Sequence, residues 1–290
     1  MIDPPIDGAD YTDDIFGVSE YKALAPQKKE FLAWHQPRKQ FVRNYQWCEQ
    51  IRMLLDEFPR ESNTLKYLGL PGVDLLDLRY FHSSVCDPRQ MQLRFLGFNN
   101  GASPASNEQV ELNISLDEVR RLPLVDPRSE IIPDDFCRVA NDNSIAWART
   151  QAFGPYDVIN LDLCDGFAKH APGTIEDTHY NALTRLLSLQ SRQKTPWLLL
   201  LTTRAGHGHI DQKALERMTD HYLKNLTDHD EFKTESHTKF AIADEVGLRQ
   251  AIGTSAGLLQ VFLVGICKWF VNLALNQSLL SKVEVKSVIG

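Results

Sequence analysis

The chain has 290 residues, of which 43% are hydrophobic and 24% charged, and its formal net charge is -7 at pH 7. This length and composition exclude a wholly disordered chain and predict a globular protein with a substantial core. The acidic balance argues against a surface that wraps nucleic acid as a whole and leaves only a local basic patch for that purpose.

The N-terminal part of the chain predicts an arm followed by a helical extension. Residues 1–27 are acidic and contain several prolines, whereas a signal peptide would begin with a basic and then an apolar stretch, so we expect a flexible arm. Residues 28–60 predict helix, because apolar side chains recur at three- and four-residue steps. The five cysteines form no C-x-x-C pair and indicate reduced thiols, so a cytoplasmic protein is expected.

Residues 61–235 alternate between apolar strands and amphipathic helices. Strands that are almost continuous apolar runs are typical of a parallel sheet covered on both faces. We therefore expect a Rossmann-like, doubly wound α/β domain with a mostly parallel sheet, whose ligand site lies at the carboxyl ends of the strands. The strands are expected at residues 64–72, 91–101, 136–143, 156–163 and 196–204.

Residues 236–290 predict a helical and strand segment that completes the domain or docks a partner. The stretch 257–276 is about as long as a membrane span, but Gln260, Lys268 and Asn272 interrupt its apolar residues. We expect a helix that is buried or covered by a protein partner rather than one in a membrane. The last ten residues, SKVEVKSVIG, alternate as a strand does.

From about residue 60 to 230 the order of elements resembles the class I S-adenosylmethionine-dependent methyltransferases, and five residues carry the likeness. Gly69 matches the first glycine of the cofactor turn, and Gly72 lies one place early for the third. Asn99 occupies the position of the ribose-binding acid, and Asp142 in ANDNS that of the aspartate near adenine. Asp162 in YDVINLD stands where the family often has an acid.

The resemblance implies that S-adenosylmethionine binds at Gly69, Gly72, Asn99 and Asp142, with Asp162 facing the substrate. The first turn, YLGLPG, departs from the pattern, because Tyr67 stands where an acid is expected and Pro71 replaces the second glycine.

Asp162 is the candidate catalytic residue, as a general base or a residue that positions the ligand; the alternative is an ordinary loop carboxylate. Its neighbour Cys164 lies between two carboxylates, which raise the pKa of a thiol and make it a poor nucleophile. Asp165 precedes a glycine and is expected to shape the turn. No metal site is predicted.

Two further sets of residues are candidates for binding anions. Arg204 and His207 follow the fifth strand, on the same edge as Asp162, and an arginine fork can hold a carboxylate or phosphate. In residues 28–47, Arg38, Lys39 and Arg43 alternate with aromatic side chains, a pattern suited to nucleic acid. The alternative for that stretch is an amphipathic helix that packs on the sheet.

Two functions are therefore open. The first is a methyltransferase-like enzyme with an altered cofactor turn and an acceptor that the sequence does not identify. The second is a non-catalytic Rossmann-like scaffold, or an adaptor for nucleic acid or protein, in a multi-protein bacterial system such as an antiviral defence system. The altered first turn favours the second.

Overall fold

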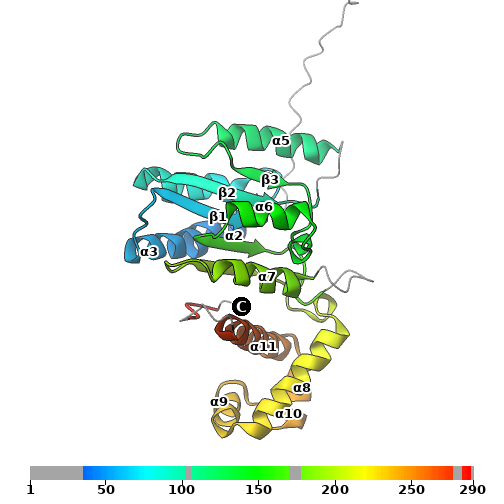
Figure 1. The fold of residues 1–290 in the computed structure, drawn as a ribbon. Coiled ribbons are helices and arrows are strands. Elements are labelled where there is room, and N and C mark those ends of the chain that lie inside the picture. Colours follow the sequence, from blue (N-terminus) through cyan, green and yellow to red (C-terminus); the bar gives the residue numbers. More distant parts are fainter. Residues whose placement is uncertain (1–34, 102–105, 170–177, 277–282, 289–290) are drawn as a thin grey trace, which may run out of the picture.

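The computed structural model describes residues 35–101, 106–169, 178–276 and 283–288 (Figure 1). Five strands form one sheet in the order β3-β2-β1-β4-β5, and every pair of neighbours is parallel. The expected Rossmann-like α/β fold is confirmed. The strands are β1 (Thr64–Gly69), β2 (Gln92–Phe98), β3 (Glu130–Ile132), β4 (Val158–Asp162) and β5 (Leu198–Thr202).

The strand order reverses between β1 and β4. The chain places β2 and then β3 on one side of β1, crosses back, and adds β4 and β5 on the other side. Gly69, at the end of β1, pairs in register with Gly97 of β2 and with Asn160 of β4. In open α/β sheets ligands bind beyond the carboxyl ends of the strands at this reversal, so the end of β1 is the place to look for a site.

One face of the sheet is covered by the helices that lie near it in the first half of the chain. Buried side chains of β1 and β2, such as Tyr67 and Phe95, pack there with Trp47, Ile51 and Phe81. The helical elements involved are a π-helical segment (Val42–Cys48), α3 (Glu49–Glu57), α4 (Leu76–Phe81) and α5 (Asn107–Arg120), and α2 (Pro37–Phe41), which has no buried residue, precedes them. We call this the N-terminal face.

The opposite face is covered by α6 (Ile145–Phe153) and α7 (His179–Gln190). Leu68, Ile159 and Leu161 point to this side, because alternate residues of a strand face opposite sides of the sheet. Both faces are thus buried, which is why most residues of the strands are apolar.

The third strand was predicted in the wrong place. Residues 136–143 do not form a strand: Phe136–Ala140 is a 3-10 helix, and the strand lies earlier, at Glu130–Ile132. Asp135 caps this helix by accepting a hydrogen bond from the Cys137 N–H at 2.8 Å. Phe136 and Val139 are both buried, which fits the three-residue repeat of a 3-10 helix.

The C-terminal part of the chain is helical: α8 (Gln212–Asp228), α9 (Asp230–Phe240), α10 (Glu245–Ile252) and α11 (Ser255–Asn276). In Figure 1, α8 to α10 lie away from the sheet, and α11 runs between them and α7. Ile266, Trp269 and Phe270 of α11 pack against the core on the α7 side of the sheet.

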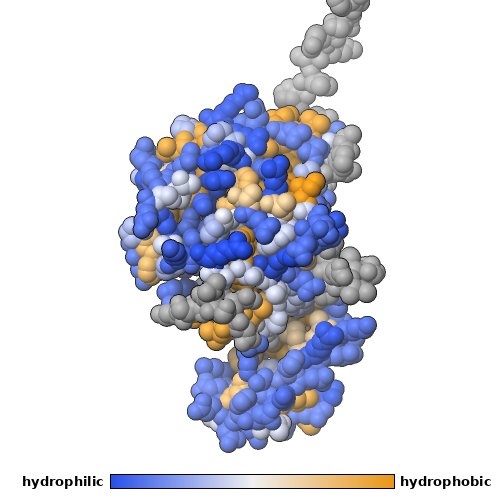
Figure 2. Space-filling model, viewed as in Figure 1, coloured by the Kyte–Doolittle hydropathy of each residue, from blue (hydrophilic) through white to orange (hydrophobic). Residues whose placement is uncertain are grey.

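Within the described residues, α11 is long and apolar enough to cross a membrane by length and composition alone, over Ser255–Leu275. Leu258 and Phe262 are fully buried, yet only 22% of its most apolar window is buried in total. Apolar atoms accordingly reach the surface where Figure 1 places α11 (Figure 2). A protein partner on this helix stays a prediction.

The expected strand at the C-terminus is also wrong where the structure describes it. Residues 283–288 have no regular secondary structure, and both Val285 and Val288 are exposed. An alternating pattern forms a strand only when a neighbouring strand supplies hydrogen bonds, and this segment pairs with none of the five strands. The predicted arm, residues 1–27, lies outside the described residues.

Candidate functional site

Asp162 ends β4 on the N-terminal face of the sheet. Val158 of β4 packs in the core of that face, and the residues at every second position after it, Asn160 and Asp162, share its side. The side chain of Asp162 is 15% exposed. The sheet therefore presents a row of polar groups along β4 that leads to its carboxyl edge.

Three basic residues of the N-terminal segment each contact a carboxylate near this edge. Lys39 and Arg43 are four residues apart in consecutive helical segments, and His35 lies two residues before α2. The pairs are His35 with Asp74 at 3.1 Å, Lys39 with Asp162 at 2.5 Å, and Arg43 with Asp77. We call these three contacts the ion-pair ladder.

The contact between Lys39 and Asp162 closes the edge over the end of β4. The Lys39 ammonium lies 2.5 Å from both carboxylate oxygens and 5.2 Å from the centre of the Trp47 ring. Asp162, the predicted catalytic residue, thus has a cation of the chain itself as its partner. Its catalytic role stays a prediction.

The deepest contact of the ladder joins two buried side chains, Arg43 and Asp77. Burial raises the pKa of the Asp77 carboxyl, and the neighbouring Arg43 guanidinium acts in the opposite direction. A buried carboxylate needs such a partner because its charge has lost the solvation of water. The pair therefore fixes the helical segment to α4.

Below the ladder, Tyr67 and Asn160 lie side by side. Burial, and then the charge of Asp77, hold the pKa of the Tyr67 phenol well above its ordinary value, while the Asn160 amide lowers it. Yet neither the phenol oxygen nor the two amide heteroatoms complete a well-formed hydrogen bond among the described residues. Unpaired buried polar groups are rare and call for a physical explanation.

The glycines of the first two strand ends accommodate side chains of the chain itself. A Cβ added at Gly69 would lie 2.2 Å from the Tyr67 hydroxyl oxygen. At Gly97 it would lie 2.4 Å from the Ile131 methyl carbon and 3.0 Å from the Pro71 ring. Tyr67, Pro71 and Ile131 therefore pack where a larger residue at either glycine would place its Cβ.

The predicted ribose contact, Asn99, bonds to the first turn instead. Its amide nitrogen donates to the Pro71 carbonyl at 2.9 Å, and its amide oxygen accepts from the Gly101 N–H at 3.1 Å. Gly72 is exposed beside this contact. Asn99 is thus engaged with the turn itself, and S-adenosylmethionine binding at this turn stays a prediction.

Asp142 lies apart from these residues. It follows the 3-10 helix rather than a strand, and its carboxylate pairs with Arg185 of α7. The structure therefore brings Gly69, Gly72, Asn99 and Asp162 to the carboxyl edge and leaves Asp142 on the side of the sheet that α6 and α7 cover.

The loops after β4 and β5 bond to each other. The carboxylate of Asp165 contacts His209 and lies 2.9 Å from the Lys169 ammonium. Lys169 and then His209 hold the pKa of Asp165 well below its ordinary value. Arg204 and His207 are both exposed in the same loop. The described residues contain no cluster of three or more side chains suited to a metal ion.

In the predicted nucleic-acid stretch, the structure separates the three basic residues. Lys39 and Arg43 pair with carboxylates, whereas Arg38 is exposed. Phe41 and Tyr45 are also exposed, and their ring centres are 4.9 Å apart. Residues 28–34 lie outside the described part of the chain.

Sequence reasoning missed the groups under the ladder. Asp77 interrupts the apolar run VDLLDL at a position where the helical repeat expects a core residue, and that conflict was the available signal. Asn160 interrupts the apolar strand VINLD in the same way. A polar residue at a core position needs a partner, and the search for one leads to Arg43.

Comparisons with known proteins give a family and distantly similar solved structures. No curated protein matches the chain. A solved structure that is similar is phosphoethanolamine N-methyltransferase 2 of Haemonchus contortus in complex with S-adenosyl-L-methionine, at 15% identity, over 84% of this chain and with a TM-score of 0.28. The match covers 54% of that enzyme, so the chain spans about half its length. The model of the PP_RS20740-like family matches residues 28–290, and the chain belongs to that family.

Proposed function

We propose that this chain uses a methyltransferase-like fold as a binding module and does not transfer methyl groups at the carboxyl edge of its sheet. The observation that carries the proposal is the packing of the first turn. Tyr67 packs against Gly69, Pro71 packs against Gly97, and Asn99 donates to the Pro71 carbonyl. A methyl donor placed as the family resemblance implies would have to compete with these contacts.

Opening the turn would be costly. The Tyr67 ring is fully enclosed and packs 5.0 Å from the Phe81 ring, centre to centre. Displacing a buried aromatic ring exposes apolar area worth about 1.5–3 kcal/mol. A cofactor would have to offset that cost, together with the lost hydrogen bond between Asn99 and Pro71, before it gained any affinity.

Calorimetric titration of the full chain with S-adenosylmethionine and S-adenosylhomocysteine tests the proposal. We expect no binding at millimolar concentration of either compound. Micromolar binding that is weakened by Asn99→Ala would overturn the proposal. Asn113→Ala is the matched control, since Asn113 is an exposed asparagine on α5 that is far from the turn in the sequence.

A second candidate, methyl transfer, is favoured by the way Lys39 is held. Helix α2, which carries Lys39, has no buried residue, so its displacement would expose little apolar area. Once Lys39 left, Asp162 would be free to face an acceptor and take its proton. The unpaired Tyr67 and Asn160 groups beneath are consistent with a site that can open.

Formation of S-adenosylhomocysteine from S-adenosylmethionine in the presence of a bacterial metabolite extract tests this candidate. Methyl transfer predicts product from the wild-type chain, faster product from Lys39→Met, and none from Asp162→Asn. If no variant binds the donor or forms product, methyl transfer is excluded and the binding module stands.

A further inference from the structure

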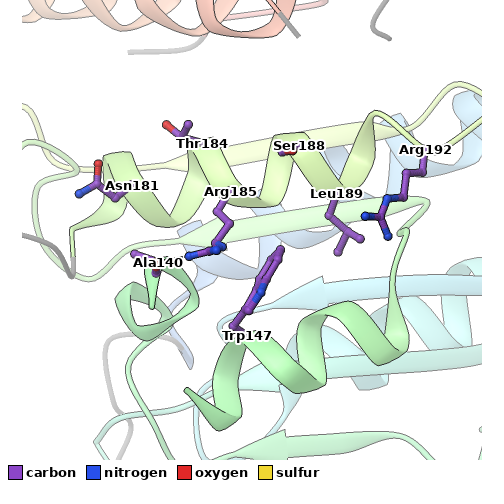
Figure 3. Close-up of a pocket in the computed structure, with 8 residues that line it drawn as sticks. All are labelled: Ala140, Trp147, Asn181, Thr184, Arg185, Ser188, Leu189 and Arg192. Atoms are coloured by element: carbon purple, nitrogen blue, oxygen red, sulfur yellow. Dashed lines mark hydrogen bonds between the residues drawn. The ribbon is translucent and has the colours of Figure 1, made fainter. Parts of the chain in front are cut away.

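A groove opens between α6 and α7, on the side of the sheet opposite the ion-pair ladder. Its cavity volume is about 440 Å³. In Figure 3 the Trp147 ring rises from α6 between Arg185 and Leu189 of α7, and the Arg192 side chain reaches in from beyond the end of α7. Cavities that hold small ligands have volumes of roughly 300–1,000 Å³, so the groove is of ligand size.

Along α7 the groove is lined at helical spacing. Asn181, Arg185, Ser188 and Arg192 recur every three or four residues and face the groove together. The neighbouring Leu189 is buried and supplies an apolar wall. One side of the groove therefore combines hydrogen-bonding groups, two guanidinium groups and an apolar surface.

Arg185 is held in position by three contacts. Its guanidinium carbon lies 4.6 Å from the centre of the Trp147 ring. It donates to the Ala140 carbonyl at 2.6 Å and pairs with Asp142. A guanidinium that stacks on an aromatic ring has a fixed orientation, so little further entropy is lost when it binds an anion.

Arg192 and Trp147 each have a hydrogen-bond donor that could contact a ligand. The Arg192 guanidinium has no hydrogen bond or ion pair with any residue that the structure describes, and the residue is exposed. The indole N–H of Trp147 has no hydrogen-bond partner within the same residues, and its ring is half-buried. Both groups line the cavity.

We infer that this groove binds a nucleoside phosphate, free or as part of a single-stranded nucleic acid. The guanidinium groups of Arg185 and Arg192 recognise the phosphate. The Trp147 ring and the Leu189 side chain provide apolar surface for the base, and the indole N–H donates to it. A lone inorganic anion would leave most of the 440 Å³ empty.

In this proposed site the Asp142 carboxylate competes with the phosphate for Arg185. Its side chain is 71% exposed and pairs with Arg185, so it occupies a cation that the phosphate would otherwise contact. An exposed ion pair is weak, and the phosphate displaces the carboxylate from Arg185. Neutralising Asp142 therefore removes a competitor and a repelling charge, and tightens binding.

The inference is independent of the carboxyl edge, so a negative titration with S-adenosylmethionine leaves it unaffected. The test is calorimetric titration of the full chain with AMP, adenosine, ribose 5-phosphate and a short oligodeoxyadenylate. We expect AMP to bind, and adenosine and ribose 5-phosphate each to bind more weakly, because each lacks half of the ligand. An oligonucleotide that binds more tightly than AMP identifies nucleic acid as the source of the ligand.

The variants locate the binding site. Arg185→Gln and Arg192→Gln should each weaken AMP binding about tenfold or more, the effect of losing a charge-assisted hydrogen bond. Asp142→Asn should tighten it. Arg149→Gln is the matched control, because Arg149 is exposed on α6, pairs with Glu130 at 3.6 Å and does not line the groove.

Three results would overturn the inference. One is the absence of binding by the wild-type chain to AMP and to the oligonucleotide at millimolar concentration. Another is an Arg149→Gln variant that loses as much affinity as Arg192→Gln. The third is an Asp142→Asn variant that binds more weakly than wild type. Circular dichroism spectra that match the wild type show that each variant is folded.

Discussion

Removing Arg43 should destabilise the protein strongly, because it leaves the Asp77 carboxylate buried without its partner. Arg43 is 3% exposed and Asp77 is 5% exposed. Breaking a buried pair by removing one partner typically costs about 3–5 kcal/mol, a large part of the roughly 5–15 kcal/mol that stabilises a protein. We therefore expect Arg43→Met to lower the free energy of unfolding in urea by this amount.

The loss should depend on pH with a definite sign. Burial raises the pKa of Asp77 above its ordinary value of 3.8, and removing Arg43 raises it further. A carboxyl whose pKa is raised on folding contributes stability that is fully present below its unfolded pKa and is lost as pH rises through its folded pKa. The deficit of Arg43→Met should thus be largest at neutral pH and shrink as pH falls.

Two controls make the test specific. Arg249→Met removes an arginine from an exposed pair with Glu245 on α10, and exposed pairs contribute about 0.2–1 kcal/mol. The double variant Arg43→Met with Asp77→Leu replaces both charges with apolar groups and should recover most of the stability. A deficit below about 1 kcal/mol, or one that does not change with pH, would refute the reasoning.

Three further predictions concern the buried groups and α11. Tyr67→Phe should leave the free energy of unfolding unchanged or raise it by up to about 1 kcal/mol, since the phenol hydroxyl has no well-formed hydrogen bond. A large decrease of the free energy of unfolding, measured in urea, would contradict this. In a native thiol-labelling assay, exposed Cys164 should react while the protein is folded, whereas Cys48, whose pKa burial raises to about 11, should react only after unfolding. Phe262→Ala on α11 should lower the free energy of unfolding by about 3–5 kcal/mol, because the Phe262 ring is fully buried. Leu275→Ala, at an exposed position of the same helix, should change the thermal midpoint little. Equal effects of the two variants would show that α11 does not pack as described.

The fold was predictable from the sequence because its sheet is covered on both faces. Four of the five strands lie within the predicted ranges, and each has five residues or more, most of them apolar. The remaining strand, β3, has three residues and is followed by Pro133. A strand that short leaves no pattern of its own, while the buried side chains of the 3-10 helix after it resemble an apolar strand in the sequence.

The candidate site was predictable only in its location. The rule for parallel sheets places Asp162 at the carboxyl edge, and the structure has it there. Its partner Lys39 is 123 residues away in the chain, and no periodicity connects the two. The four-residue spacing of Lys39 and Arg43 predicts a shared helix face, but not the carboxylates that this face contacts.

The ion-pair ladder specifies position more than it adds stability. Buried ion pairs contribute little net stability compared with well-packed apolar residues of similar size, so Arg43 and Asp77 are a poor way to strengthen a core. The pairs of Lys39 with Asp162 and Arg43 with Asp77 do, however, set the position of the helical segment above the sheet. In that position Lys39 lies on Asp162 at the carboxyl edge. The groove that we propose as a binding site is separate from this edge, because Trp147, Arg185 and Arg192 line it between α6 and α7 on the opposite side of the sheet.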